Sequence, residues 1–323
     1  MTMPFGSPLK PCSICLGTGP FGSSIPTDQS FEVMDTYAEA GGNFLDTAHI
    51  YAAWMDDGEG ASERTVGAWV RSRGLRDQII IGTKGGHPPL NAMEQGRLSA
   101  KDLEQDLNES LERLGMDVVD IYWLHRDDPN CDLAELIEAL NNFLSDGRIR
   151  AFGASNWSVA RIEEANAWAE ANGMRGFTAN QPGWSLAERS PEAPPLHGML
   201  SVDQDTQAWH AKTQLPLAAY TSRAGGYFSG ENVAWAREGF EGPCPHGVEF
   251  DSAVSRIRLR VAAEIGNRKG YQTSQIALAY LLHQPFPVFP IIGTGNPGRV
   301  QSAITACKIE LTKQELARLE ARE

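Results

Sequence analysis

Four side chains able to move protons or hold charge follow three successive β-rich segments of the chain. Asp46, Lys84 and His125 each stand at or directly after the end of one such segment. Tyr51 comes five residues after Asp46. Because the carboxyl ends of parallel strands meet at one mouth of a barrel, we expect the four side chains to converge there. Each residue alone is explained as well by a helix cap or a solvated charge, so the interpretation depends on the combination.

Together the four residues suit the reduction of a carbonyl group. A carbonyl that accepts a hydride develops alkoxide charge, which requires a positioned acid and hydrogen-bond donors. Tyr51 can donate the proton, but a free phenol has a pKa of about 10, and a cationic Lys84 nearby would lower it. Asp46 would hold that ammonium and balance its charge. A neutral His125 would hydrogen-bond the carbonyl oxygen and align it.

The elements that must position these residues alternate between short β-rich runs and segments of helical period. This alternation is typical of parallel strands joined by crossover helices. Eight β-rich runs suit a closed (β/α)8 barrel, or TIM barrel, in a single domain over residues 1–323. The predicted strands are 13–16, 43–45, 79–82, 118–124, 150–153, 178–180, 216–219 and 288–292.

The clearest helix precedes the fourth predicted strand. Between Leu103 and Leu114, leucines recur at intervals of four, four and three residues and form one apolar face. Ser99 is expected to cap its start with Asp102 completing a capping box, and Gly115 stands where a helix usually ends. The other predicted helices are 31–40, 63–73, 133–145, 159–171, 203–212, 273–283 and 299–306.

Two segments rich in proline or glycine interrupt the pattern, at 185–200 and 229–250. We interpret both as long loops of the same domain. Because the carboxyl face of a barrel carries the active site, such loops suit substrate walls or lids. Surface insertion is the alternative.

Composition and charge exclude several classes of partner. Of the 323 residues, 41% are apolar and 21% charged, as expected for a globular chain. The formal net charge of −13 would repel a polyphosphate backbone, so no nucleic-acid partner is expected. No apolar stretch approaches the roughly 20 residues that span a bilayer, and no basic and apolar leader begins the sequence. We therefore expect a cytoplasmic protein without membrane association, and the oligomeric state stays open.

The five cysteines are too few and too scattered for a disulfide framework. Cys12 and Cys15 have redox-motif spacing, but they lie in a strand-like run rather than at a helix start, where a thiol pKa is lowered. We predict a structural role for this pair. The sequence also lacks the HxH and HExxH patterns of zinc hydrolases, so we expect no metal.

The motifs around the candidate residues resemble those of the aldo-keto reductases in type, order and spacing. They are Asp46-Thr-Ala-His-Ile-Tyr51, Thr83-Lys84-Gly85, Leu124-His125 and Gly153-Ala-Ser155-Asn156. The likeness runs from the segment 16–19 to the segment 290–294, which is nearly the whole chain. The resemblance implies a NAD(P)H-dependent reductase of an aldehyde or ketone with the catalytic tetrad Asp46, Tyr51, Lys84 and His125.

The resemblance also implies a cofactor site. Ser155, Asn156 and Gln181 would hydrogen-bond the nicotinamide carboxamide, and Tyr220 would stack on the nicotinamide ring. A helix start carrying Arg299 would hold a 2′-phosphate, which favours NADPH, although such a turn also serves simple helix initiation. The further cofactor contacts expected are Gly17, Thr18, Gly19, Asp46, Thr221, Ser222, Arg223, Gly226, Gly293, Thr294, Gly295 and Asn296.

The sequence departs from the family pattern at two places in this cofactor site. Many members have Lys where Gly293 stands and Glu-Asn at positions 302–303, so the adenosine grip is altered here and NADH stays possible. In the segment after Tyr220, the family commonly has Ser-Pro-Leu-Ala where this chain has Thr221-Ser222-Arg223-Ala224. Arg223 then either contacts the pyrophosphate or reaches solvent.

The expected substrate is a small carbonyl compound. Tyr51, His125, Trp54 and Trp184 are the candidate substrate contacts, with a sugar, steroid-like or aromatic carbonyl all open. Tyr227, Phe228 and Trp235 could extend an apolar wall, although loop aromatics also serve as anchors. We also expect His49 to line the pocket and His283 to be a helix-end cation.

A second class of function stays open beside the enzyme. Some relatives of the aldo-keto reductases bind the cofactor but serve as channel-associated or regulatory subunits. The complete tetrad argues against this alternative. Slow turnover with tight cofactor binding would favour it.

Overall fold

A closed barrel of eight parallel strands forms the centre of the molecule. The computed structural model describes residues 10–322. Each strand pairs with the next one along the chain, and β8 pairs with β1. The strands are β1 (Cys15–Gly17), β2 (Phe44–Asp46), β3 (Ile80–Gly85), β4 (Val119–Leu124), β5 (Ile149–Ser155), β6 (Asn180–Gln181), β7 (Leu217–Ala219) and β8 (Val288–Gly293). Each falls on a segment predicted as a strand, so the (β/α)8 fold is confirmed.

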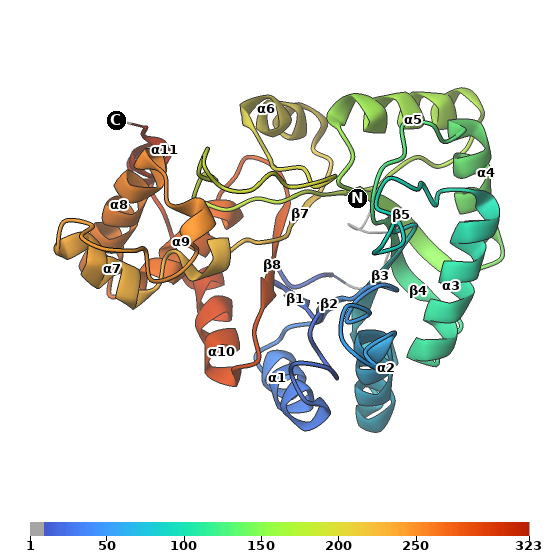
Figure 1. Cartoon of the computed structure of the whole chain (residues 1–323), viewed down its shortest axis with the longest axis horizontal. Helices are drawn as coiled ribbons and strands as arrows, with labels where there is room; N and C mark the ends of the chain where they lie inside the picture. The colour runs from blue at the N-terminus through green and yellow to red at the C-terminus, as the bar shows by residue number, and fades with distance from the viewer. Residues whose placement is uncertain (1–9, 323) are drawn as a thin grey trace.

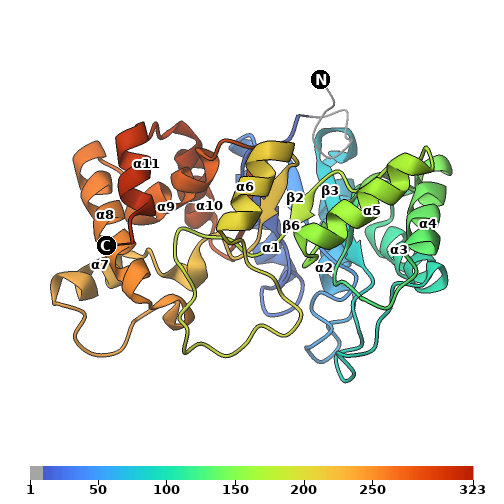
Figure 2. The ribbon, with the colours of Figure 1, turned by 90° about the horizontal axis from the view of Figure 1, so that it is seen from above.

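Helices lie outside the strands (Figure 1). Figure 2 shows long loops, the 185–200 segment among them, projecting on one side of the barrel. Within residues 10–322 the α-helices are α1 (Thr27–Glu39), α2 (Ala61–Arg73), α3 (Ala100–Leu114), α4 (Leu133–Ser145), α5 (Val159–Ala171), α6 (Gln204–Thr213), α7 (Gly230–Arg237), α8 (Ala253–Lys269), α9 (Thr273–Leu282), α10 (Pro297–Thr305) and α11 (Lys313–Glu320). None of these helices is long and apolar enough to cross a membrane.

Three of the helices lie outside the predicted set. The prediction of a loop over 229–250 is wrong for its first part, which forms α7. The Ser229 side chain accepts a hydrogen bond from the Asn232 N–H at the start of α7, and Trp235 is buried on that helix. Apart from Gly230, which is the first residue of α7, the glycines and prolines that indicated a loop follow the helix. The helices α8 and α11 were not predicted.

Helix α3 begins and ends where the sequence indicates. The Ser99 hydroxyl accepts from the Asp102 N–H, and Gly115 has a φ of 64° in the left-handed region, where glycine carries little strain. The reciprocal half of the capping box does not form as expected, because the Asp102 carboxylate accepts from the Ser99 hydroxyl instead. The cap therefore satisfies one helix amide.

The barrel interior is filled with side chains from alternate strand positions. Cys15 is among them, fully buried beside aromatic and aliphatic residues. Burial raises the pKa of the Cys15 thiol well above its ordinary value. Cys12 and Cys15 are both free thiols, which is consistent with the structural role predicted for the pair.

Helix α2 packs closely on the end of α3 at Gly67. A Cβ atom at this position would lie 2.1 Å from the carbonyl oxygen of Leu114, which belongs to the backbone. We expect Gly67→Ala to lower the free energy of unfolding by about 1–3 kcal/mol through overpacking, despite the better helix propensity of alanine. Urea unfolding would measure this change.

The matched control is Gly230→Ala in α7, where no atom lies within 4 Å of the added methyl group. This variant should stay within about 0.5 kcal/mol of the parent protein. Equal unfolding midpoints for both variants would contradict close packing of α2 on α3 at Gly67.

Candidate active site

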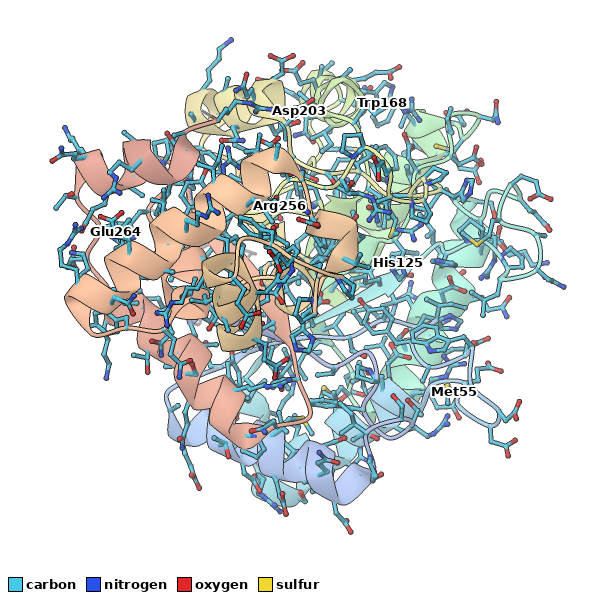
Figure 3. All side chains as sticks on the ribbon, turned by 60° about the vertical axis from the view of Figure 1, so that its left-hand side comes forward. Met55, His125, Trp168, Asp203, Arg256 and Glu264 are labelled. Atoms are coloured by element: carbon cyan, nitrogen blue, oxygen red, sulfur yellow. The ribbon has the colours of Figure 1, made fainter. Side chains whose placement is uncertain are left out.

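The four predicted catalytic side chains meet at the carboxyl end of the barrel. Asp46 is the last residue of β2, Lys84 lies near the end of β3, and His125 directly follows β4. Tyr51 lies in the turn after β2. Asp46 and Lys84 are almost completely buried, and His125, which is labelled in Figure 3, is buried as well. The closed barrel therefore brings together residues that lie up to 79 positions apart along the chain.

The ammonium group of Lys84 has a partner for each of its three hydrogens. Its Nζ lies 2.6 Å from Asp46 Oδ2 and 3.0 Å from the Tyr51 hydroxyl. The carbonyl oxygen of Thr47 accepts the third hydrogen bond at 2.7 Å. An ammonium has three donors and no acceptor, so this set fixes its position.

Burial and charge act against each other on Lys84 and Tyr51. Burial disfavours the ammonium, but Asp46 and Tyr51 together outweigh it and raise the pKa of Lys84. For Tyr51, burial is the largest effect and raises the pKa, while Lys84 lowers it in part. Lys84 therefore acts on the pKa of Tyr51 in the expected direction, but burial outweighs it and the net shift is upward. Tyr51 is held in its protonated form.

His125 is held in its neutral form, as expected. Burial, followed by the positive charge of Lys84, lowers the pKa of His125 well below its ordinary value. Its ring centroid lies 5.8 Å from that of Tyr51 and 4.8 Å from that of His87. The imidazole therefore stands beside the phenol with a proton to donate from one nitrogen.

A cavity of about 290 Å³ opens above these groups. Seven predicted site residues line it, together with five that the prediction did not include. Its lining residues are Ile50, Tyr51, Trp54, His87, Leu90, His125, Arg126, Ser155, Asn156, Gln181, Met199 and Tyr220. The residues that the prediction missed lie in the turns and loops after β2, β3, β4 and β6, where no sequence period marks them. His87 and Arg126 are polar residues just beyond a strand end, and this feature of the sequence could have indicated that they belong to the site.

The amides predicted to hold a nicotinamide are joined to the tetrad. Gln181 Nε2 donates to Asp46 Oδ1 at 2.9 Å. Asn156 Nδ2 donates to the His125 carbonyl oxygen, and Ser155 Oγ donates to the Gln181 carbonyl oxygen. The Tyr220 hydroxyl donates to Asn156 Oδ1 at 2.7 Å, which places the phenol ring across the same cavity. Catalytic and cofactor candidates thus form one hydrogen-bonded unit.

The predicted residues after β1 support this unit through the backbone. The Thr18 hydroxyl donates to the Asp46 carbonyl oxygen. A Cβ at Gly17 would lie 2.9 Å from the Ile291 side chain, and one at Gly19 would lie 3.7 Å from the Tyr51 ring. These residues hold β1 close to the site.

A second group of predicted residues lies at the ends of β7 and β8. The Ser222 hydroxyl donates to the Ile291 carbonyl oxygen, and the Asn296 side chain accepts from the Gly298 and Arg299 amides at the start of α10. Burial, with a smaller contribution from Arg299, lowers the pKa of Arg223. Neither arginine forms an ion pair with a residue in the range 10–322. The remaining predicted contacts in these turns are Thr221, Gly226, Gly293, Thr294 and Gly295.

Trp184 does not line this cavity but lines an adjoining one of about 930 Å³, which shares Met199 and Tyr220 with it. Its indole stacks on Phe286 with ring centroids 5.9 Å apart. The aromatics at 227, 228 and 235 are buried as loop and helix anchors. Trp54 is the predicted tryptophan that lines the candidate substrate cavity.

The predictions for two histidines have different outcomes. The His49 ring does not line the cavity: its Nε2 lies 2.7 Å from Glu109 Oε2 on α3. His283 Nε2 accepts from the Leu311 N–H while its Nδ1 bonds the Ala279 carbonyl oxygen. His283 is the C-cap residue of α9, so it stands at a helix end as predicted. No cluster of metal-ligand side chains occurs in the described part of the chain.

A parallel eight-stranded barrel with a buried Lys, Asp and His and a half-buried Tyr at its carboxyl face defines the class of the protein. The chain belongs to the aldo/keto reductase family, which it matches over residues 13–323. Members of this family are oxidoreductases that act on small-molecule carbonyl compounds with a nicotinamide cofactor.

Relatives of known name agree with this assignment. The norsolorinic acid reductase stcV of Emericella nidulans is 30% identical over 321 residues, which cover 95% of this chain and 77% of that protein. The aryl-alcohol dehydrogenase [NADP(+)] of Phanerodontia chrysosporium is 26% identical over 309 residues, covering 92% and 77%. The solved thermostable aldo-keto reductase Tm1743, in complex with the inhibitor epalrestat, has the same fold, with a TM-score of 0.72, 22% identity and coverage of 95% and 94%.

The buried ion pair generates a prediction about stability. In Asp46→Asn the Lys84 ammonium keeps its burial but loses its counter-charge, and removing one partner of a buried pair costs about 3–5 kcal/mol. Urea unfolding should show a loss of this size, and Asp46→Asn combined with Lys84→Met should recover part of it.

The control is Asp35→Asn, because the Asp35 carboxylate pairs with Arg73 at the surface. A surface pair contributes about 1 kcal/mol or less. If Asp46→Asn and Asp35→Asn lost the same stability, Lys84 would not depend on Asp46 for its charge balance.

Proposed function

We propose that the protein reduces an aldehyde or ketone to the alcohol with hydride from NADPH, and that Tyr51 donates the proton. The observation that carries this proposal is the Lys84 ammonium, bound at once to Asp46 and to the Tyr51 hydroxyl below a cavity that His125 lines. Such a group can protonate an oxygen that enters the cavity and then stabilise the phenolate left behind.

The residues present fit a nicotinamide cofactor. The amide and hydroxyl groups of Ser155, Asn156 and Gln181 stand beside the tetrad, where a carboxamide could exchange hydrogen bonds with them. Arg223 and Arg299 provide two cations without carboxylate partners in the described chain, as a phosphate-bearing ligand requires. When bound, the cofactor supplies the hydride.

The remaining steps are those of the protein's own side chains. The carbonyl oxygen is placed between the Tyr51 hydroxyl and His125, which hydrogen-bonds it as a neutral imidazole. As charge develops on that oxygen, Tyr51 transfers its proton to it. The Lys84 ammonium, held by Asp46, stabilises the tyrosinate until solvent returns the proton.

We infer NADPH rather than NADH as the preferred cofactor. Support comes from the paired cations Arg223 and Arg299, which suit the extra phosphate. The relative from Phanerodontia chrysosporium also carries NADP(+) in its name. Because Gly293 stands where many family members have lysine, we also expect some activity with NADH.

An aromatic carbonyl is the substrate class that the cavity favours. Trp54, Leu90 and Met199 give its rim apolar surface, and the Trp54 and Tyr51 rings meet edge to face with centroids 6.2 Å apart. Two relatives are named for norsolorinic acid and for aryl alcohols. An aryl aldehyde is therefore the first substrate to test.

Tyr51→Phe tests the proposed acid. Removing the phenolic proton should lower kcat/KM for an aryl aldehyde about a hundredfold or more, while the Kd for NADPH stays unchanged because the ring remains. Initial rates of NADPH oxidation, repeated with NADH, would measure both the loss and the cofactor preference.

Equal activity of Tyr51→Phe and the parent protein would show that another group donates the proton. A parent protein that binds NADPH tightly but reduces no aldehyde or ketone would favour the cofactor-binding regulatory subunit. Preference for NADH would contradict the role of the paired arginines.

The pH dependence of reduction follows from the shifted groups. The pKa of His125 is lowered, so the imidazole stays neutral as the pH passes the ordinary value of 6.5. The pKa of Tyr51 is raised above 10.0, so the phenol keeps its proton throughout the neutral and mildly alkaline range. For an aldehyde that does not titrate, kcat/KM should be flat from pH 6.5 to 10 and fall above that range.

Initial rates across this range would check the profile, with protein stability followed in the same buffers. An inflection near pH 6.5 would show that His125 titrates at its ordinary pKa. A decline that begins near neutrality would show that Tyr51 loses its proton there.

A further inference from the structure

Arg126 directly follows His125 and lines the candidate substrate cavity. Its Nε atom is buried and makes no hydrogen bond within residues 10–322. The guanidinium makes one long contact, from Nη1 to the His125 carbonyl oxygen at 3.4 Å. A half-buried cation thus reaches the cavity with most of its five donors unused.

The neighbouring carboxylates do not neutralise this charge. Asp127 pairs with Arg161, whose Nε lies 3.4 Å from Asp127 Oδ2. Asp128 accepts a hydrogen bond from the Asn130 N–H at 2.9 Å. No ion pair to Arg126 occurs within the described residues. Burial lowers the pKa of Arg126, and the neighbouring Tyr220 and Tyr51 offset this effect only in part.

The side chain is also held in place. The Arg126 stem lies under Gly198 of the 185–200 segment, where an added Cβ would stand 3.7 Å from its Cδ. The backbone on its other side is fixed, because the Asn156 amide donates to the His125 carbonyl oxygen. A held guanidinium loses less entropy when it binds a ligand than a free surface arginine does.

A buried cation without a counter-charge is costly unless a ligand supplies that charge. The planar guanidinium fork matches a carboxylate through two parallel hydrogen bonds. Because Arg126 and the Tyr51 hydroxyl line one small cavity, one molecule can place a carbonyl at Tyr51 and an anionic group at Arg126.

We propose that Arg126 binds a carboxylate of the substrate, so that the natural substrate is a carbonyl compound that also carries a carboxylate. This inference rests on the proposed reductase function and extends it by a substrate class. Arg126 then acts as a specificity residue that binds the substrate equally in the ground state and in the transition state. Its effect should therefore fall on KM more than on kcat.

The test uses 3-carboxybenzaldehyde and 4-carboxybenzaldehyde, each beside its neutral methyl ester, with the parent protein, Arg126→Met and Arg126→Lys. The parent protein should have a kcat/KM at least about tenfold higher for one of the acids than for its ester, as expected for one charge-assisted pair. Arg126→Met should remove this preference, mainly through KM, and change the ester less than about threefold. Arg126→Lys should keep part of it, because lysine has the charge without the fork.

Arg175→Met is the matched control, because Arg175 is exposed and lies outside the cavity. This variant should keep the preference for the acid. If Arg126→Met does not fold, inhibition of the parent protein serves instead. Benzoate should then inhibit ester reduction at least about tenfold more strongly than benzamide.

Three results would overturn the inference and leave the reductase function intact. The first is an equal kcat/KM for the ester and its acid in both pairs. The second is an equal loss of kcat/KM for acid and ester in Arg126→Met, and the third is weaker binding of NADPH by that variant. In the fallback experiment, equal inhibition by benzoate and benzamide would overturn it in the same way. If the parent protein oxidised NADPH with none of the four carbonyl compounds, the proposed function itself would fail for aryl aldehydes.

Discussion

The pairing of the Lys84 ammonium with the Asp46 carboxylate inside the barrel is the interaction on which the site depends. Two charges at 1% and 2% exposure cannot rely on water, so each of their hydrogen-bonding groups needs a protein partner. Lys84 uses its three hydrogens on Asp46, Thr47 and Tyr51, and the second Asp46 oxygen accepts from Gln181. Replacing a buried pair by apolar side chains is often neutral or stabilising, so its presence here favours a role in chemistry.

The barrel makes this pairing possible through strand register. Asp46 on β2 lies opposite Gly82 on β3, and Lys84 comes two residues later on the same inward face. At this level of the barrel Gly82 leaves room for the Trp123 side chain, because a Cβ at position 82 would lie 2.8 Å from the indole nitrogen. One residue of slip in β3 would turn Lys84 away from the interior. The Asp46–Lys84 pair and the imidazole directly after β4 therefore follow from the closed parallel sheet, whereas the position of Tyr51 also depends on the turn after β2.

This dependence on register explains which features the sequence predicted. Strand ends are marked by the change from apolar to polar residues, so the pattern of residue types is enough to place Asp46, Lys84 and His125. Arg126 and His87 could not be placed in the cavity, because the direction of a side chain beyond a strand end depends on loop packing. Trp184 shows the same limit, since an aromatic in a loop packs on Phe286 as readily as on a ligand. Helix α7 was missed because it has only eight residues and the glycines and prolines that follow it indicated a loop.

The distribution of positive charge links the cofactor and substrate proposals. The chain has a formal net charge of −13, so its arginines have many possible carboxylate partners. Arg126 and Arg223 are nevertheless half-buried without an ion pair to any described residue, the first in the cavity and the second beyond Tyr220. An unpaired cation that water screens poorly makes the local electrostatic potential more positive, and this attracts anions even in an acidic protein. The surroundings of the two positions differ: the charge of Arg299, at the start of α10, acts on Arg223, whereas Arg126 shares its cavity with Tyr51 and His125. One unpaired cation thus suits the phosphates of a cofactor, and the other suits a charge carried by the molecule being reduced.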